Sequence, residues 1–360
     1  MTQVLFLTRL YSPYIGGVET HVLNVTKELQ QKGYQVSILT EQFESDLLEH
    51  EQLNGIDIIR IPENAILSKV TLWKWIWSHR ELFIKADIVH VHDVFWWVVP
   101  VLPLMKSKYF VTFHGWEGQF PIKKTAILQR QAAAKLAKGV IQVGEYIEKW
   151  YKTKPDIVTY GGSDSVQPGS NLAQNILKKV FSAAKQGRFI SQEKQTYEAV
   201  FVGRLSEDND ISTVCEFFSL LKNEHPNAHF LFIGDGPLAE LCKSIGTVTG
   251  FVPDVDKYLV ESKMVCANSY LSILNAQSLG KLVCSFYSNQ LKKDYLTEYP
   301  QAKNMIIVGT AKEGVQKLTN MKKNPPLLKA KIKQASEWAK LQTWQKVSQH
   351  YEYLWKKVRV

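Results

Sequence analysis

The sequence predicts an α/β protein with two doubly wound parallel-sheet domains, and three observations support this prediction. The chain has 360 residues, a length that favours two domains of about 150 residues each. Short apolar runs alternate with helical stretches in the first half, and the same alternation restarts at Ala199 after a polar segment. Strands that alternate with helices in this way form parallel sheets with both faces covered.

The first half opens with a strand over residues 4–7 and a turn over 12–17. A helix follows, because apolar side chains recur near helical period between Val18 and Leu29 and the pattern stops at Gly33. Further buried strands are expected over residues 35–40, 56–61, 87–92, 109–114 and 139–143.

The second half repeats the pattern after an irregular connection over residues 161–196. A helix is expected over 211–221 and a long helical segment over 327–357. We therefore expect a first domain over residues 1–160 and a second over 161–342. The strands of the second domain are expected over 199–202, 228–233, 264–267 and 282–285.

The net charge of +10, from 44 Lys and Arg against 34 Asp and Glu, favours an anionic partner. Nucleic acid, an acidic membrane surface and a phosphate-bearing ligand all fit this sign. No zinc finger, RRM signature or concentrated basic arm is present, so no nucleic-acid partner is expected. Much of the excess lies between Lys322 and Lys357, where a solvated helix face is the plainest interpretation.

The four cysteines lie far apart and form no C-x-x-C pair, which argues against a zinc site or a disulfide framework. We expect a reducing compartment. No signal peptide is recognisable, and no run approaches the ~18 apolar residues that span a bilayer. The expectation is a cytoplasmic protein.

Three places combine glycine with a polar side chain where ligands bind in parallel sheets, beyond the carboxyl ends of strands. The Gly16-Gly17 pair joins the first strand to its helix, where unpaired N–H groups attract anions. Gly203-Arg204 could clamp a diphosphate, and His114 ends a buried strand. A plain tight turn, a surface arginine and a structural histidine are the alternatives.

These features occur within segments that resemble one family in order and spacing over nearly the whole chain. The segments resemble family-4 retaining glycosyltransferases of the GT-B type. They are SPYIGGVETHVLNVTKELQQKGYQVSILT at 12–40, IVHVHD at 88–93, VTFHG at 111–115, FVGRLS at 201–206, FIGDGPL at 232–238, TGFVPD at 249–254, LSILNAQSLGKLV at 271–283 and TWQKVSQHYEYLW at 343–355.

The resemblance implies two Rossmann-like domains that face each other across a cleft. The first would bind the acceptor and the second the nucleotide sugar. A C-terminal helix over 343–360 would cross back to the first domain, and Trp344, Tyr351 and Trp355 recur at a spacing that can bury one face. The implied reaction moves a sugar, with retention and without metal or other cofactor, from a nucleotide-diphosphate sugar to a glycan or lipid-linked acceptor.

The resemblance also implies residue roles. His114 would contact the donor sugar, and Arg204 would neutralise the leaving diphosphate. Stabilising the negative charge that develops on this leaving group is the main catalytic task. The acceptor side would include Glu19, His21, His92 and Asp93. The donor and its phosphates would meet Gly16, Gly17, Gly203, Asn209, Gly234, Gly236, Gly250, Val252 and Asn275.

Two Asp-x-Asp pairs could in principle hold Mg²⁺, namely Asp208 with Asp210 and Asp254 with Asp256. Such pairs are common in polar turns, and solvated loops are the preferred interpretation. No metal site is therefore expected.

The chain departs from the family at its donor site. Asn209 stands where the family usually has a lysine, Gly144 where a serine is common, and Asn275 where the second of two glutamates belongs. The first glutamate and its glycine loop are missing at Ser269-Tyr270. A working transferase and a degenerate saccharide-binding or partner subunit are therefore both open, and a nucleotide-sugar epimerase of the same architecture is less favoured.

Residues 66–85 combine Trp73, Trp75 and Trp77 with Lys69, Lys74 and Arg80, and a second apolar run covers 94–105. Tryptophans interleaved with cations suit a bilayer interface. The hypothesis is peripheral binding of the first domain to an anionic membrane at its inner face, and the alternative is that these tryptophans fill a core.

Overall fold

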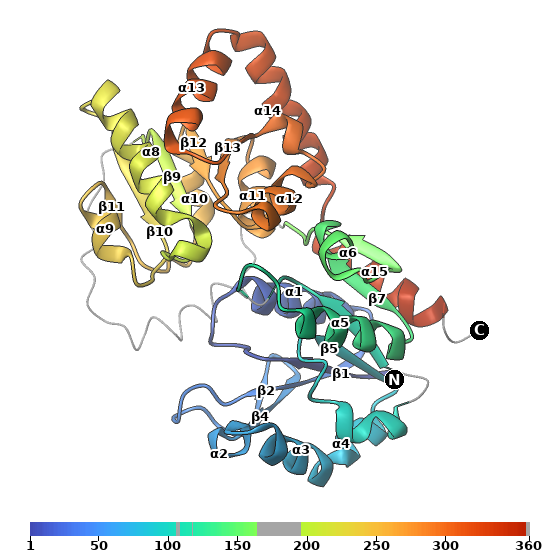
Figure 1. Cartoon of the computed structure of the whole chain (residues 1–360). Coiled ribbons are helices and arrows are strands. Elements are labelled where there is room, and N and C mark those ends of the chain that lie inside the picture. Colours follow the sequence, from blue (N-terminus) through green and yellow to red (C-terminus); the bar gives the residue numbers. More distant parts are fainter. Residues whose placement is uncertain (106–108, 117, 164–195, 358–360) are drawn as a thin grey trace. The chain divides into compact units, whose positions relative to one another are not determined.

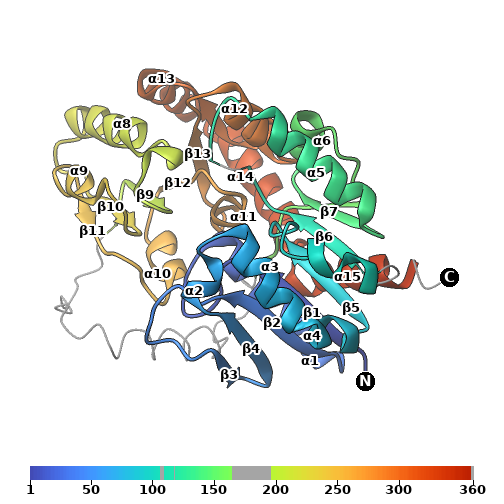
Figure 2. The same ribbon diagram turned by 60° about the horizontal axis from the view of Figure 1, so that its bottom comes forward.

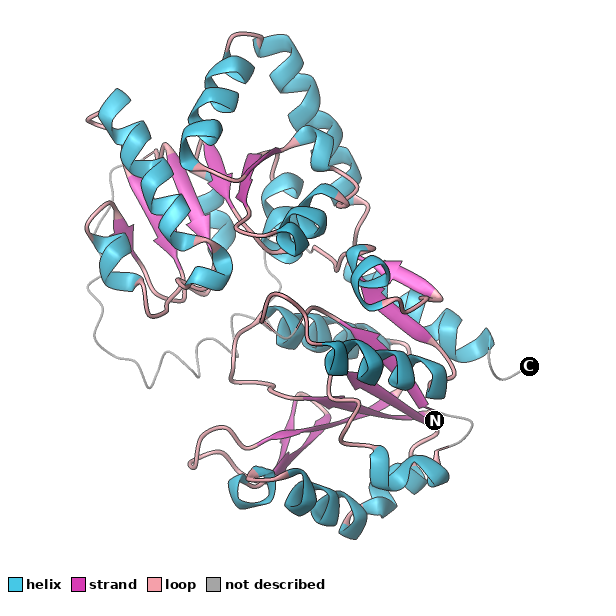
Figure 3. Cartoon of the chain, in the orientation of Figure 1, coloured by secondary structure: helices cyan, strands magenta, loops and turns pink. Residues whose placement is uncertain are grey.

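The protein is built from two compact units. The computed structural model describes residues 1–105, 109–116, 118–163 and 196–357. The first unit comprises Met1–Thr159 and Trp344–Val360, and the second comprises Tyr160–Thr343. Each unit has one sheet with helices beside it (Figure 3). The expected connection over 161–196 lies mostly outside the described residues.

The sheet of the first unit has eight strands in the order β3-β4-β2-β1-β5-β6-β7-β8, and every neighbouring pair is parallel except β3–β4. The strands are β1 Gln3–Thr8, β2 Gln35–Glu41, β3 His50–Leu53, β4 Ile56–Ile61, β5 Ile88–His92, β6 Tyr109–Phe113, β7 Val140–Val143 and β8 Ile157–Thr159. The helices are α1 Gly17–Gln31, α2 Glu63–Ile66, α3 Lys69–Ser78, α4 Arg80–Lys85, η1 Val99–Leu104, α5 Lys124–Leu136, α6 Tyr146–Tyr151 and α15 Trp344–Lys357.

The central strands are buried on both faces because their side chains alternate between two helical layers. Val89 and Val91 of β5 pack in the core formed with α3, α4 and η1. His90, between them, points to the other face, where its Nδ1 accepts a hydrogen bond from Trp355 of α15 at 3.1 Å. The strand thus sends its two valines to one layer and its two histidines to the other.

The C-terminal helix α15 belongs to the first unit, although the chain reaches it from the second. Figure 1 shows it in red beside the green elements α6 and β7. Tyr351 and Trp355 are buried, and Lys32 of α1 pairs with Glu352 at 2.6 Å. The helical segment expected over 327–357 is interrupted at residues 341–343, and the C-terminal helix expected from residue 343 begins at Trp344.

Gly139 allows α15 to approach β7. A Cβ built there would lie 2.5 Å from Cδ1 of Leu354, whose side chain is 1% exposed. We expect Gly139→Ala to lower the free energy of unfolding of the first unit by about 1–3 kcal/mol, as overpacking does. Urea unfolding measures this. The matched control is Gly17→Ala, where a Cβ meets nothing within 4 Å; equal stability of the two variants would contradict the prediction.

The sheet of the second unit has six parallel strands in the order β11-β10-β9-β12-β13-β14. The strands are β9 Ala199–Val202, β10 Phe230–Ile233, β11 Thr247–Val248, β12 Met264–Cys266, β13 Leu282–Phe286 and β14 Ile306–Val308. The helices are η2 Glu207–Asn209, α8 Ile211–Glu224, α9 Ala239–Lys243, α10 Val255–Val260, α11 Tyr270–Ser278, α12 Gln290–Thr297, η3 Ala302–Asn304, α13 Ala311–Lys322 and α14 Pro325–Lys340. Figure 2 gives a second view of these elements.

All four cysteines lie in one buried core of the second unit, together with six phenylalanines. They are free, and the sulfurs of Cys215 and Cys242 lie 3.8 Å apart. Burial raises the pKa of the Cys266 thiol well above its usual value, so these cysteines serve as small apolar side chains.

The predicted fold class of two parallel-sheet α/β domains is confirmed. Four strands of four residues or fewer were not predicted from the sequence, namely β3, β8, β11 and β14. β3 is an antiparallel edge strand in an otherwise parallel sheet. Among the described residues, no helix is both long and apolar enough to cross a membrane.

Candidate functional site

The carboxyl ends of β5 and β6 bring His92 and His114 into contact. Their rings share a hydrogen bond of 2.8 Å between Nδ1 of His92 and Nε2 of His114. His92 is 1% exposed, whereas His114 is only partly buried. Because neighbouring parallel strands end at the same edge, the residue following β6 lies beside the last residue of β5. His114 therefore lies just beyond the end of β6, with its ring oriented by the buried His92.

Asp93 fixes the backbone of His114. It has a left-handed φ of 60°, which aspartate tolerates better than most residues. Its two carboxylate oxygens accept from the backbone N–H of His114 at 3.1 and 3.2 Å. The buried guanidinium of Arg130 lies 3.7 Å from this carboxylate and 4.2 Å from the ring of Tyr151. A charged pair thus holds the turn that carries His114.

A second hydrogen-bond network joins α15 to the side chains of α1, β5 and β6. The Tyr351 hydroxyl contacts Nε2 of His21 at 2.9 Å and Oγ1 of Thr112 at 3.1 Å. Thr112 also contacts Nε2 of His90 at 2.7 Å. His21, which the resemblance placed on the acceptor side, is 2% exposed and packs edge to face against His114, with ring centroids 4.7 Å apart. His21 therefore supports His114 from within the core.

Burial is the main cause that keeps these four histidines uncharged. It lowers the pKa of His21 to about 3 and the pKa values of His90, His92 and His114 well below 6.5, and neighbouring histidines lower those three further. Within the described ranges, no group of three His, Cys, Asp or Glu residues could hold a metal ion. The cluster is a neutral hydrogen-bonded framework.

The neutral histidines make stability depend on pH. Since their folded pKa values lie below the unfolded value of 6.5, the unfolded chain binds more protons below that pH. The neutral histidines make their full contribution to the free energy of unfolding above about pH 6.5, and this contribution is lost as the pH falls. We expect the free energy of unfolding of the first unit to drop by up to about 1.4 kcal/mol per pH unit for each histidine. Urea unfolding at pH 7.5 and 5.5 measures this, and equal values would contradict it.

The predicted glycine turn before α1 has the residues and position that the sequence indicated. Gly16 precedes α1 with an extended backbone, and Gly17 is its first residue. A Cβ at Gly16 would lie 2.3 Å from a carboxylate oxygen of Glu19. The Glu19 side chain folds back over the start of the helix, beside Gly16. The negative charge of Glu19 therefore lies where the positive end of the helix dipole would attract an anion.

In the second unit, the turns after β9, β10 and β11 interlock. Gly203, Gly234 and Gly250 all have positive φ angles. A Cβ at Gly234 would lie 2.0 Å from the carbonyl oxygen of Gly203, and one at Gly236 2.5 Å from that of Leu205. The N–H of Gly234 donates to Gly250 at 3.0 Å. Only glycine permits this close backbone approach, so the predicted glycines form one surface at the carboxyl edge.

The side chain of Arg204 projects from this glycine surface into solvent. The side chain is 59% exposed, and its nearest carboxylate is that of Asp208 at 3.8 Å. The amide of Asn209 donates to the Arg204 carbonyl at 3.0 Å, and Asn268 donates to the Asn209 carbonyl at 2.6 Å. Asn209 therefore shapes the arginine loop from within, in the position where the family places a cation.

The expectation that Asp208 and Asp210 lie in a solvated loop is wrong for Asp210. It is 3% exposed, and its carboxylate lies 2.5 Å from Nζ of Lys292, which is 4% exposed. Burial raises the pKa of Asp210, and Lys292 opposes that rise. The two charges are engaged with each other, and Asp208 faces Arg204, so this Asp-x-Asp pair is divided.

The other Asp-x-Asp pair is also divided. Asp254 accepts from the backbone of Lys257 at 3.3 Å and caps α10, whereas Asp256 accepts from the Asn275 amide at 2.7 Å. Val252 is half-buried in the turn before α10. Asn275 on α11 thus lies beside a carboxylate of the neighbouring helix.

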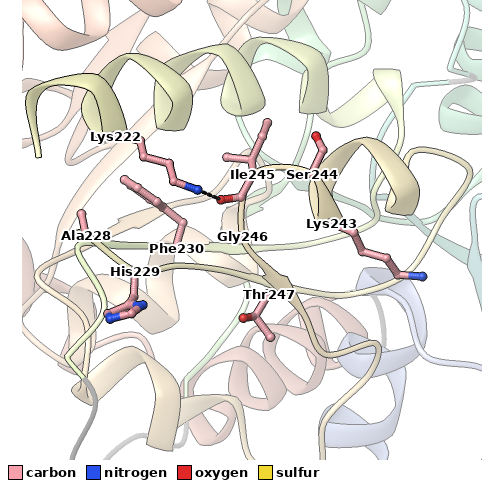
Figure 4. A pocket seen from close by; sticks show the side chains of 9 residues that line it. All are labelled: Lys222, Ala228, His229, Phe230, Lys243, Ser244, Ile245, Gly246 and Thr247. Carbon is pink, nitrogen blue, oxygen red and sulfur yellow. Dashed lines mark hydrogen bonds between the residues drawn. The ribbon is translucent and has the colours of Figure 1, made fainter. Parts of the chain in front are cut away.

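A pocket lies at the opposite edge of the second sheet, at the amino ends of β10 and β11 (Figure 4). Lys222 donates across it to the Ile245 carbonyl at 3.2 Å. Its lining contains none of the residues singled out from the sequence; the lining residues are Lys222, Ala228, His229, Phe230, Lys243, Ser244, Ile245, Gly246 and Thr247.

Three residues important to these arrangements were missed from the sequence, namely Arg130, Asn268 and Lys292. Tyr351 was predicted as a buried residue of the C-terminal helix, but its hydrogen bonds were not. Arg130 and Lys292 lay on helical stretches where a charged side chain usually faces solvent. The His90–His92 alternation in IVHVH was a usable signal, since residues two apart share one face of a strand.

The two units match two glycosyltransferase families. The family described as Glycosyltransferase Family 4 matches residues 15–158, and the family described as Glycosyl transferases group 1 matches residues 196–308. The alpha-monoglucosyldiacylglycerol synthase of Acholeplasma laidlawii is 24% identical over 252 residues, 63% of this chain. The match spans 62% of that relative, less than two thirds of its length.

The same fold occurs in solved structures. Sucrose-phosphate synthase from Thermosynechococcus elongatus superposes with a TM-score of 0.73 at 15% identity, over 99% of both chains. Anabaena HepE, in complex with UDP and glucose, has a TM-score of 0.67 at 14% identity, over 98% of this chain and 99% of that one. Since both units match glycosyltransferase families and the fold is shared, the chain belongs to the GT-B glycosyltransferases, with a family-4 first unit and a group-1 second unit.

Proposed function

We propose that the protein moves a sugar from a nucleotide-diphosphate sugar to a glycan or lipid-linked acceptor, with retention and without a metal ion. The observation that supports this most is the carboxyl edge of the second sheet, where interlocked glycine turns present the exposed Arg204. A cationic side chain beside bare backbone suits a leaving diphosphate. Anabaena HepE, which shares the fold, was solved with UDP and glucose.

In this proposal each unit has its own task. Gly203, Gly234, Gly236 and Gly250 form the donor surface, and Arg204 takes up negative charge as the diphosphate departs. In the first unit, His114 contacts the donor sugar, oriented by His92 and Asp93. The first unit also receives the acceptor.

The altered donor site retains a carboxylate. Where the family has its second glutamate, Asn275 donates its amide to Asp256 at 2.7 Å. In this proposal Asp256 accepts from a hydroxyl of the donor in that glutamate's stead. Carboxylates are strong acceptors for hydroxyl groups, so the substitution at Asn275 is compatible with an active enzyme.

Binding of nucleoside diphosphates tests the donor proposal. The panel is UDP, GDP, ADP and dTDP, with the corresponding nucleosides as controls. At about 100 times its dissociation constant, the matching diphosphate should stabilise the protein by about 2.7 kcal/mol, and its nucleoside should do much less. A lack of stabilisation by every diphosphate favours the degenerate homologue instead. Retention is tested separately by the anomeric configuration of the product.

We further propose that the first unit meets its acceptor at an anionic membrane through the surface of α2, α3 and α4. Trp97 fills the core, whereas Trp77 is 49% exposed and carries the Arg80 guanidinium 5.4 Å from its ring. Leu67 and Val70 are exposed beside Lys69. A relative named for the synthesis of a glucosyl lipid supports this choice. Vesicle flotation of Trp77→Ser tests it, and flotation equal to that of the wild type would refute it.

A further inference from the structure

The helix pair α13–α14 of the second unit carries a concentrated positive charge that the proposed transfer reaction does not use. Residues 311–340 contain eight lysines against two glutamates, a net charge of +6 within a chain whose total is +10. The lysines are Lys312, Lys317, Lys322, Lys323, Lys329, Lys331, Lys333 and Lys340. A concentrated cluster of one sign creates a local field that recruits an oppositely charged partner.

The fold turns these lysines outward. The two helices lie against each other (Figure 1), and their buried sides consist of small or apolar residues such as Gly314, Leu318 and Ala335. Leu328 and Ile332 pack against the core of the second unit. Seven of the eight lysines are exposed, and Lys331 is half-buried. The charge therefore lies on the solvent-facing sides of the two helices, which together we call the α13–α14 surface.

Nearby acids neutralise only part of this charge. Lys333 pairs with Glu337 at 3.7 Å, and Lys322 pairs with Glu198 at 3.5 Å. Glu198 is shared, because Lys263 lies closer to it at 2.6 Å. The remaining glutamate of the helix pair, Glu313, accepts from the backbone N–H of Gly309. The surface keeps a clear positive excess.

The turn between the helices adds an apolar tip. Asn324 caps α14, which begins with Pro325 and Pro326, and the next side chain, Leu327, is 53% exposed. Lys322, Lys323 and Lys329 surround it in the sequence and are exposed. A single exposed leucine is ordinary on a protein surface. An exposed leucine flanked in the sequence by exposed lysines has the composition of interfacial segments, in which the apolar group enters the acyl boundary and the cations meet headgroups.

The side-chain types favour a lipid surface over nucleic acid. Neither helix contains an arginine, the residue that forms bidentate contacts with phosphates and bases. Their one aromatic side chain, Trp338, is half-buried against Tyr299, with ring centroids 5.4 Å apart, and is not available for stacking on a base. We propose that the α13–α14 surface is a second, electrostatic contact of this protein with anionic lipid membranes, carried by different residues from the α2–α4 surface.

Vesicle binding by the full chain tests this proposal. The probe is a vesicle of phosphatidylcholine with phosphatidylglycerol, and the variant is Lys322→Gln/Lys323→Gln/Lys329→Gln. Each lysine near an anionic surface contributes roughly fivefold to binding, so the triple variant should lose about 100-fold in partition coefficient. The loss should shrink at high salt. The matched control removes three exposed charges from the first unit, Lys135→Gln/Lys138→Gln/Lys154→Gln, and should bind as the wild type does.

The outcomes separate the sources of binding. A triple variant that binds as tightly as the wild type overturns the proposal, and so does an equal loss in the control, which would show an effect of net charge alone. Wild-type protein that binds a single-stranded oligonucleotide but not the vesicles overturns it as well. Thermal unfolding of each variant confirms that the chain is folded. The Trp77→Ser variant measures separately how much the α2–α4 surface contributes to vesicle binding. The result for one surface can therefore be interpreted even if the other surface does not bind.

Discussion

Replacing Arg204 with alanine is expected to lower the transfer rate about a hundredfold, because removing one oriented charge from the leaving group costs about 3 kcal/mol. The side chain is 59% exposed and makes no buried contact, so the fold should be retained. The backbone of the loop is held independently: the N–H of Gly203 donates to Ile233 at 3.1 Å and that of Leu205 to Asp235 at 2.9 Å. The variant therefore isolates the charge.

Steady-state kinetics with the best donor measure this effect, and two further variants make it specific. Asp208→Asn removes the carboxylate 3.8 Å from Arg204 and should strengthen donor binding, an effect of opposite sign. Lys222→Ala removes a cation from the pocket at the opposite edge of the sheet and should leave kcat/KM unchanged. Wild-type kcat/KM in Arg204→Ala would show that the diphosphate is bound elsewhere.

Much of the fold was predictable because its central strands are short, rich in apolar side chains and separated by turns or helical stretches. β4 and β9 have the expected limits, since Ile56–Ile61 and Ala199–Val202 are bounded by glycine or proline. β3 was missed because His50–Leu53 is polar and half-exposed, and it forms a strand only through antiparallel pairing with β4. Such an edge strand has no hydrophobic pattern of its own.

The candidate site was predictable only in part. Parallel topology placed His92 and His114 at one edge, so their contact follows from the strand order. The network behind them joins remote parts of the sequence: Tyr351 is 239 residues from its partner Thr112. Lys292 and Asp210 are 82 residues apart. Local spacing carries no information on such pairs, and a charged residue read from sequence alone is best placed in solvent.

Breaking the buried Asp210–Lys292 pair is expected to be the most destabilising single change in the second unit. Lys292→Met should lower its free energy of unfolding by about 3–5 kcal/mol, because the Asp210 carboxylate would remain buried without a counter-charge. The two side chains are 2% and 6% exposed, so water cannot replace the lost ammonium. Asp210 also begins α8, and its φ of 53° leaves few residues that fit there.

The dependence on pH distinguishes a lost charge pair from lost packing. Burial already raises the pKa of Asp210, and without Lys292 that pKa should rise further. A folded pKa above the unfolded value favours the folded state at low pH and disfavours it as the pH rises. The penalty of Lys292→Met should therefore be largest near neutral pH and shrink toward pH 4. In Lys292→Met/Asp210→Asn, whose asparagine tolerates the left-handed backbone, most of the stability should return, as measured by urea unfolding. A double variant no more stable than Lys292→Met, at every pH, would show that Lys292 acts through packing rather than charge.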